Sequence, residues 1–176
     1  KSKGNYLTFI DPDDFVSRDT YCLNMNILLA DESIDILQYP IARYWNQTID
    51  KFNVTEQTIE DKEELLGIWW RGDVISFSMC NKIFKRELFR NITFSEGKLS
   101  EDTELVSILY KCVNKFFISN KGLYHYRVRE DSQTYKYTFH THLCLFQAHY
   151  KIYTELIKYN SLKGHKAIAF NRLLRR

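Results

Sequence analysis

The segment NYLTFIDPDDFV, residues 5–16, constrains the fold most because it joins a strand-like run directly to three aspartates. Residues 6–10 alternate in polarity and are rich in aromatic and β-branched side chains, which predicts a β-strand. Pro12 lacks a backbone N–H and restricts the residue before it, so the chain must leave the strand and turn there. The aspartates at positions 11, 13 and 14 are therefore expected at the carboxyl end of a strand.

Strand-like and helical segments alternate along the rest of the chain, which favours an α/β fold. The 176 residues, 44% of them hydrophobic, suffice for one globular domain with a substantial core. Further strands are expected within residues 34–39, 75–89 and 115–131, the second with a short helix behind it and the last as two runs around an Asn-Lys-Gly turn. Helices are expected up to about residue 30, around Trp69 and Trp70, and over residues 141–159 and 162–174. Residues 46–64 are expected to form a polar hairpin or excursion.

Two serines are expected to cap helices, because a serine hydroxyl accepts hydrogen bonds from the first free backbone N–H groups of a helix. Ser17 would cap the first helix and Ser100 a later one. Their expected apolar faces are Tyr21, Leu23, Ile27 and Leu28 in the first helix, and Leu105, Ile108, Leu109 and Cys112 in the later one.

Composition excludes several classes of protein. The four cysteines form no CxxC pair, so the sequence indicates neither a zinc ribbon nor a thioredoxin-type site, and they predict reduced core positions in a cytosolic protein. The chain contains no run of eighteen apolar residues, so no membrane-spanning segment is expected. It lacks an initiating Met, so we expect it to be part of a longer protein. Residues 1–74 are acidic and the remainder is basic, which permits a cation site beside an anion-attracting surface.

The aspartates provide the first candidate site. Carboxylates this close repel one another unless a cation or water separates them, and Asp11 and Asp13 can turn toward the same side. A hard divalent ion such as Mg²⁺ or Mn²⁺ suits such a pair, with substrate phosphates completing the shell. A solvated turn is the alternative, but ligands of open α/β sheets bind beyond the carboxyl ends of strands.

A second acidic pair, Glu101 and Asp102, is expected at the start of the helix after Ser100. The helix dipole alone can account for both carboxylates. In the functional alternative, Asp102 is a general base that takes a proton from an attacking hydroxyl group. A helix N-terminus weakens a base, so burial beside phosphates would have to restore its basicity.

Basic and aromatic residues supply further candidates. Arg127 and Arg129 share one face of an expected strand, where they could clamp a pyrophosphate or simply face solvent. His125 could ligate a metal or pack among its neighbours, and Trp69 and Trp70 could stack on a sugar or lie in the core. No recognisable nucleic-acid motif accompanies the late aromatic and basic residues, so we expect no nucleic-acid partner.

Four motifs in order resemble family 2 glycosyltransferases, the inverting enzymes of GT-A fold that build bacterial polysaccharides. They are KGNYLTFIDPDDFV (3–16), similar to the strand that carries the DxD motif of this family, CNKIFKRELF (80–89), SEGKLSEDTEL (95–105) and KGLYHYRVREDSQT (121–134). Together they cover about residues 1–135, and their shared order makes the resemblance far more specific than any one motif.

The resemblance implies a role for each candidate residue. Asp11 and Asp13 match the pair that binds the divalent metal and the diphosphate of a nucleotide-sugar donor, and Asp14 supports them. Asp102 matches the catalytic base, which would deprotonate the hydroxyl of a glycan or lipid-linked acceptor. Arg127 and Arg129 fall in the family's flexible loop near the diphosphate, and His125 stands where the family usually has tyrosine.

The resemblance also implies a GT-A-like, Rossmann-like mixed sheet flanked by helices. Residues 1–135 would form the C-terminal portion of the transferase domain, and residues 136–176 a helical extension. The family's first strands, which form most of the nucleoside pocket, are absent, so we expect these 176 residues alone to transfer little or no sugar. A QxxRW motif is also absent, which argues against the processive branch.

Two other classes stay open: a DxD phosphatase, which would require Thr or Val where Phe15 stands, and a non-catalytic carbohydrate-binding or assembly module. We expect a cytoplasmic protein. Its basic C-terminal helices could lie against the inner face of an anionic membrane or in solvent.

Overall fold

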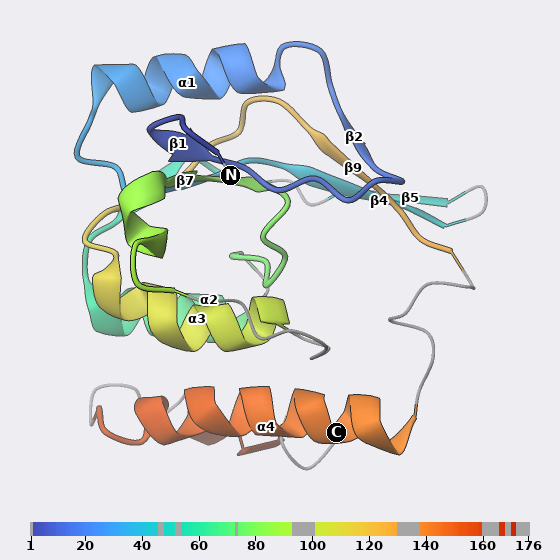
Figure 1. The fold of residues 1–176 in the computed structure, drawn as a ribbon, viewed down its shortest axis with the longest axis vertical. Coiled ribbons are helices and arrows are strands. Elements are labelled where there is room, and N and C mark those ends of the chain that lie inside the picture. Colours follow the sequence, from blue (N-terminus) through green and yellow to red (C-terminus); the bar gives the residue numbers. More distant parts are fainter. Residues whose placement is uncertain are drawn as a thin grey trace.

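The computed structural model describes residues 2–45, 48–51, 54–72, 74–92, 101–129, 138–159, 166–167 and 170–171. Within this part of the chain, two mixed β-sheets lie between helices, with α1 on one side and α2 and α3 on the other (Figure 1). The long helix α4 lies outside α3. The architecture is therefore the mixed α/β arrangement that the alternation of segments predicts.

The first sheet contains five strands in the order β1 (Tyr6–Leu7), β7 (Lys82–Lys85), β3 (Ile36–Gln38), β8 (Phe116–Ile118) and β6 (Gln57–Ile59). The second contains β2 (Phe15–Val16), β9 (Tyr124–Arg127), β4 (Ile41–Trp45) and β5 (Thr48–Lys51). β3 pairs parallel with β8, and β4 pairs parallel with β9, whereas the other neighbours are antiparallel. The strand β9 thus lies between β2 and β4.

The helices are α1 (Thr20–Ala30), α2 (Lys62–Arg71), α3 (Glu101–Cys112), α4 (Phe139–Leu156) and the 3-10 helix η1 (Arg86–Phe89). The helix α2 begins with Asp61, whose side chain accepts a hydrogen bond from the Glu64 N–H, and ends at Gly72, which has a φ of 66°. The helix α4 begins with a reciprocal cap between Thr138 and Thr141. Among the described helices, none is long and apolar enough to cross a membrane.

Successive side chains along the strands lie in two different hydrophobic cores. Ile36 and Phe84 lie in the core beneath α2, α3 and α4, whereas their neighbours Leu37 and Ile83 lie in the core that α1 covers. Trp69 and Trp70 are both fully buried in the larger core, which confirms that they are core residues. Both faces of the central strands are therefore buried.

The first helix begins later than predicted. Its N-cap is Asp19, not Ser17, because the Ser17 hydroxyl is hydrogen-bonded to the His125 ring. The buried positions of α1 include Thr20 and Asn24 beside the expected Leu28. The predicted apolar face was therefore only partly right. Asn24 accounts for part of the difference, because its amide donates to the carbonyls of Thr20 and Lys121 and so ties the helix to the loop before β9.

The later helix also buries a rotated face. Leu105 and Leu109 are buried as predicted, but Val106 and Tyr110 accompany them, and Ile108 and Cys112 are exposed. The reason is that α4 packs on α3 and covers positions that an amphipathic pattern in α3 alone does not identify. The predicted Ser100 cap lies outside the described residues.

The other predicted strands and helices agree with the structure to different degrees. The strand and short helix within residues 75–89 are confirmed as β7 and η1, whereas β4 lies before the predicted polar hairpin and was missed. The two runs within residues 115–131 form β8 and β9, which enter different sheets. The first C-terminal helix is confirmed as α4, and most of residues 162–174 lies outside the described part of the chain.

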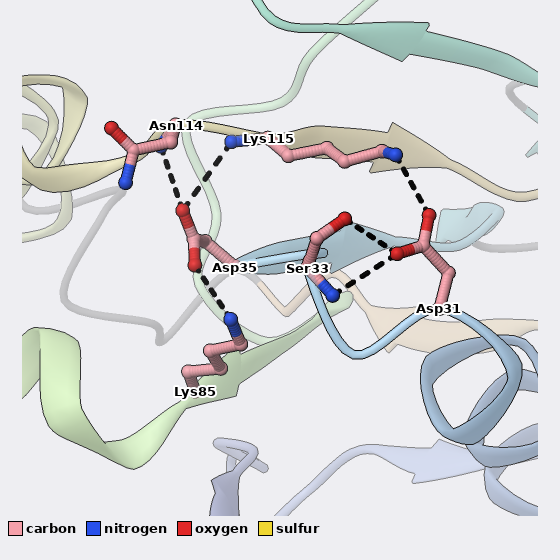
Figure 2. A network of polar contacts seen from close by, with 6 residues as sticks. All are labelled: Asp31, Ser33, Asp35, Lys85, Asn114 and Lys115. Atoms are coloured by element: carbon pink, nitrogen blue, oxygen red, sulfur yellow. Dashed lines mark hydrogen bonds and ion pairs between the residues drawn. The ribbon is translucent and has the colours of Figure 1, made fainter.

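A buried carboxylate joins three elements of the first sheet. Figure 2 shows Asp35, just before β3, accepting hydrogen bonds from the Lys85 ammonium at 2.9 Å and from the Asn114 N–H at 2.7 Å. The Lys115 N–H also donates to it, and the Lys115 ammonium pairs with Asp31 at 2.7 Å. Asp35 therefore fixes the end of α3 against β3 and β7.

Candidate active site

The acidic segment forms a tight turn between β1 and β2. The Asp14 N–H donates to the Asp11 carbonyl at 3.1 Å, which closes a four-residue turn with Pro12 at its second position. Proline favours that position because its φ is already fixed near the required value. The predicted strand over residues 6–10 is shorter in the structure, because β1 ends at Leu7, and the aspartates follow it after residues 8–10.

Tyr124 of β9 holds this turn in place. Its buried hydroxyl accepts a hydrogen bond from the Asp11 N–H at 3.3 Å and donates to Asp14 Oδ2 at 2.7 Å. The Arg127 N–H donates to the other oxygen of Asp14 at 2.8 Å. Burial raises the pKa of the Asp14 carboxyl, although these two hydrogen bonds act in the opposite direction. Asp14 therefore anchors the turn to β9.

The side chains of Asp11 and Asp13 both keep contact with solvent. Asp11 is exposed, and the Asp13 side chain retains 29% exposure while it pairs with Arg129 Nη2 at 2.8 Å. Among the described residues, no group of three or more His, Cys, Asp or Glu side chains could by itself hold a metal ion. Magnesium sites in proteins often use only one or two carboxylates beside substrate phosphates, and the donor pair Asp11 and Asp13 fits that type.

His125 occupies a packed position within the second sheet. Its ring stacks on Phe15 with centroids 4.2 Å apart, and its two nitrogens are hydrogen-bonded to Ser17 Oγ at 2.9 Å and to the Tyr44 hydroxyl at 2.6 Å. Burial lowers the pKa of His125, which favours the neutral ring. A bond to a metal would have to replace one of these hydrogen bonds, and the assignment of His125 as a ligand stays a prediction.

The two arginines lie at and just beyond the end of β9. The Arg127 guanidinium lies 5.2 Å from the centre of the Phe15 ring, and Arg129 follows the strand and pairs with Asp13. Both residues therefore border the acidic turn. Their role as a diphosphate clamp stays a prediction.

Asp102 lies in the first turn of α3 and faces the loop before β7. Its Oδ2 accepts a hydrogen bond from the Met79 N–H at 3.2 Å. The neighbouring Glu101 side chain lies outside the described part of the structure. No sequence pattern could identify Met79, because its contribution is a backbone N–H, which every residue except proline carries.

The thiol of Cys80 connects the two acidic regions. Burial raises the pKa of this thiol to about 12, with further contributions from the negative charges of Asp11 and Asp102. Tyr124, whose hydroxyl is hydrogen-bonded to the acidic turn, packs in the same hydrophobic cluster as Cys80. Asp102 accepts its hydrogen bond from the N–H of Met79, the residue just before Cys80, so the acidic turn and the start of α3 both reach the surroundings of this buried residue. The two predicted carboxylate groups, far apart in sequence, therefore border one region.

A separate surface pocket of about 600 Å³ lies along the outer edge of β1 and η1. Its charged lining has both signs, with Glu32 and Glu87 beside Lys85, Arg86 and Arg90. None of the predicted site residues lines it. The mixed charge favours no class of ligand, so the pocket does not alter the location of the candidate site.

The sequence is related to curated bacterial proteins. It is 31% identical over 135 residues to the minor teichoic acid biosynthesis protein GgaB of Bacillus subtilis, with 76% of this chain and 15% of that protein covered. It is 28% identical over 148 residues to the glycosyltransferase GlyA of Streptococcus pneumoniae, with 73% of this chain and 20% of that protein covered. The glycosyltransferase GlyG of the same species is 26% identical over 143 residues, with 74% of this chain and 46% of that protein covered.

The fold is similar to that of a solved structure, S. aureus TarS 1-349. The match has a TM-score of 0.64 and 16% sequence identity, and it covers 99% of this chain and 47% of that one. No family model matches the sequence. The chain thus spans less than half the length of each relative, and the resemblance to glycosyltransferases and the expected fold class are both confirmed.

Proposed function

The chain belongs with the bacterial glycosyltransferases of GT-A-like fold, and on this premise we propose that the protein is a metal-dependent, inverting family 2 enzyme. It transfers a sugar from a nucleotide-sugar donor to a hydroxyl group of a glycan or lipid-linked acceptor. The product belongs to the polysaccharides of the bacterial cell surface. The name of one relative, a minor teichoic acid biosynthesis protein, supports this class of product.

One observation carries the proposal: the DxD turn is hydrogen-bonded to Tyr124, which packs with Cys80, and Asp102 is hydrogen-bonded to the neighbouring Met79, although about ninety residues separate the two acidic groups in the chain. A sugar transfer requires a site for the departing diphosphate and a base for the attacking hydroxyl close together. The accessible pair Asp11 and Asp13 supplies the former, and Asp102 supplies the latter.

The acidic turn binds the donor. Asp11 and Asp13 would hold a divalent cation, Mg²⁺ or Mn²⁺, and such an ion would supply positive charge to neutralise the departing nucleoside diphosphate. Asp14 keeps the turn in place through its hydrogen bonds to β9. Arg129 exchanges its ion pair with Asp13 for the diphosphate, and Arg127 contributes a second guanidinium group.

Asp102 acts as the general base. It accepts the proton of the acceptor hydroxyl while that oxygen attacks the anomeric carbon on the side opposite the diphosphate. A single in-line displacement inverts the configuration at that carbon. The Met79 N–H orients the carboxylate, since it donates to Oδ2.

The domain division and cellular location belong to the same proposal. Residues 1–135 form part of the transferase domain, and residues 136–176 form a helical extension whose helix α4 packs on α3. The protein works in the cytoplasm, at the inner face of the membrane where lipid-linked acceptors are found. The whole protein, rather than these 176 residues alone, carries the activity.

Calorimetric titration of the complete gene product with UDP and GDP, with and without Mn²⁺, tests the donor site. We expect metal-dependent binding that is lost in Asp13→Ala. The matched control is Asp19→Ala, another exposed aspartate in the same region, which should bind as the unaltered protein does. Equal binding by Asp13→Ala, or binding that does not require metal, would contradict the proposed site.

A further inference from the structure

Lys82 of β7 is an unusual lysine because it has no exposed surface. Its ammonium donates to the Ser76 carbonyl at 2.9 Å, to the Asn81 side-chain oxygen at 3.1 Å, and to the Ser78 carbonyl. The Ser76 hydroxyl is a further partner at 3.3 Å. Burial of an ammonium group costs several kcal/mol even after relaxation, so a fold retains one only where its hydrogen bonds offset much of that cost.

The oxygens around Lys82 belong to the loop that contacts Asp102. Ser76 and Ser78 lie just before Met79, whose N–H donates to Asp102 Oδ2. Trp69 of α2 also donates to the Ser76 carbonyl, and its ring lies 5.9 Å from the Lys82 nitrogen. The loop therefore surrounds the ammonium, and these hydrogen bonds fix the direction in which the Met79 N–H points.

The charge of Lys82 is also linked to Asp102. Burial lowers the pKa of Lys82 to about 7, whereas the negative charges of Asp102 and Cys80 act in the opposite direction. These are the titratable groups that act on the ammonium within the described part of the chain. Because the pKa of Cys80 is about 12, its thiol is neutral near pH 7, so Asp102 is the effective partner. By reciprocity, a charged Lys82 favours the ionised form of Asp102.

We propose that Lys82 is a positioning residue for Asp102: it orders residues 76–79 so that the Met79 N–H orients the carboxylate, and its charge favours the ionised carboxylate. The inference rests on the proposed role of Asp102 as the base. Lys82 itself touches neither substrate, since its ammonium is enclosed by the loop.

Kinetics of the complete gene product test this role in three variants whose folding is first checked by circular dichroism. Lys82→Met should lower kcat by about 10- to 100-fold with little change in donor affinity, because a misplaced base slows the chemical step. The acid limb of its pH–rate profile, where Asp102 becomes protonated, should move to higher pH, because the positive charge that favours the ionised carboxylate is gone. Lys82→Arg keeps the charge and should keep the limb in place, and Lys121→Met is the control at an exposed lysine.

Unchanged kcat and an unchanged pH profile in Lys82→Met would overturn the proposal. An equal shift of the limb in Lys82→Met and Lys82→Arg would also overturn it, because the effect would then come from packing and not from charge.

A second measurement needs no change at the buried position and no sugar transfer. Nuclear magnetic resonance of protein with labelled lysine follows the titration of Lys82 in the unaltered protein and in Asp102→Asn. We expect a titration near neutral pH that moves to lower pH in the variant, because the favourable negative charge is gone. An unmoved titration would overturn the link between the two residues. This result stands even if the protein transfers no sugar, so failure of the inference and failure of the proposed function are distinguishable.

Discussion

Replacement of Asp35 by alanine tests the account of how the fold is held together. The Asp35 side chain is only 8% exposed, and it accepts hydrogen bonds from the Lys85 ammonium and from the N–H groups of Asn114 and Lys115 (Figure 2). Alanine removes every acceptor and leaves a largely buried ammonium beside two backbone donors. The structure offers no other described carboxylate bonded to Lys85.

The magnitude follows from the burial of the pair. Removal of one partner of a buried ion pair costs about 3–5 kcal/mol, because the other charge is left without compensation. For a chain of this length, each kcal/mol lowers the melting temperature by about 2–4 °C. We therefore expect Asp35→Ala to unfold roughly 6–20 °C below the unaltered protein.

Thermal and urea unfolding followed by circular dichroism measure this change, with Asp31→Ala as the matched control. Asp31 lies four residues earlier and also pairs with a lysine, but its side chain is 39% exposed. Exposed ion pairs contribute little, so the control should lose only a small fraction of what Asp35→Ala loses. A loss below about 1 kcal/mol in Asp35→Ala, or an equal loss in both variants, would refute the reasoning.

Two further predictions concern α4 and the cysteines. Burial raises the pKa of Glu155, but hydrogen bonds with Lys158, Tyr110 and Lys111 outweigh it and lower the pKa to about 2 from a usual 4.5. Glu155 should therefore stabilise the protein above pH 4.5 and lose that effect as the pH falls toward 2, so the stability difference from Glu155→Gln, measured by urea unfolding, should shrink over that range. A difference independent of pH would argue against this ion-pair network. For the cysteines, mass spectrometry after brief treatment with a thiol reagent should find Cys22 and Cys112 modified, and Cys80 and Cys144 unmodified until denaturant is added. Rapid labelling of Cys80 would contradict its burial.

The strands and helices with strong local patterns could be predicted from the sequence. The aromatic and β-branched run before Pro12 and the apolar periodicity around Trp69 are local signals: α2 appears where predicted, and β1 appears at the start of the predicted strand but ends at Leu7. The faces of α1 and α3 could not be predicted as well, because Asn24 and Tyr110 are buried by contacts with distant segments. Local periodicity carries no information about such partners.

The acidic residues of the candidate site were also identifiable, but the groups that hold them were not. Tyr124, Met79 and Lys82 act through a hydroxyl, a backbone N–H and a buried ammonium, and none of these groups belongs to a sequence motif for such a role. Tyr124 reaches Asp14 because β9 pairs with β2, a contact between residues 110 apart in sequence. Strand pairing of this range leaves no local signature, so only the structure could assign these roles.

The most direct test of the central claim is the rate of sugar transfer by Asp102→Asn in the complete gene product. Asparagine keeps an oxygen for the Met79 N–H but cannot take a proton, so we expect kcat to fall by about 10²- to 10⁴-fold while donor binding is retained. Glu104→Gln, two residues later on the same helix, should keep the rate of the unaltered protein. Retention of full activity by Asp102→Asn would contradict its role as the base and with it the proposed mechanism.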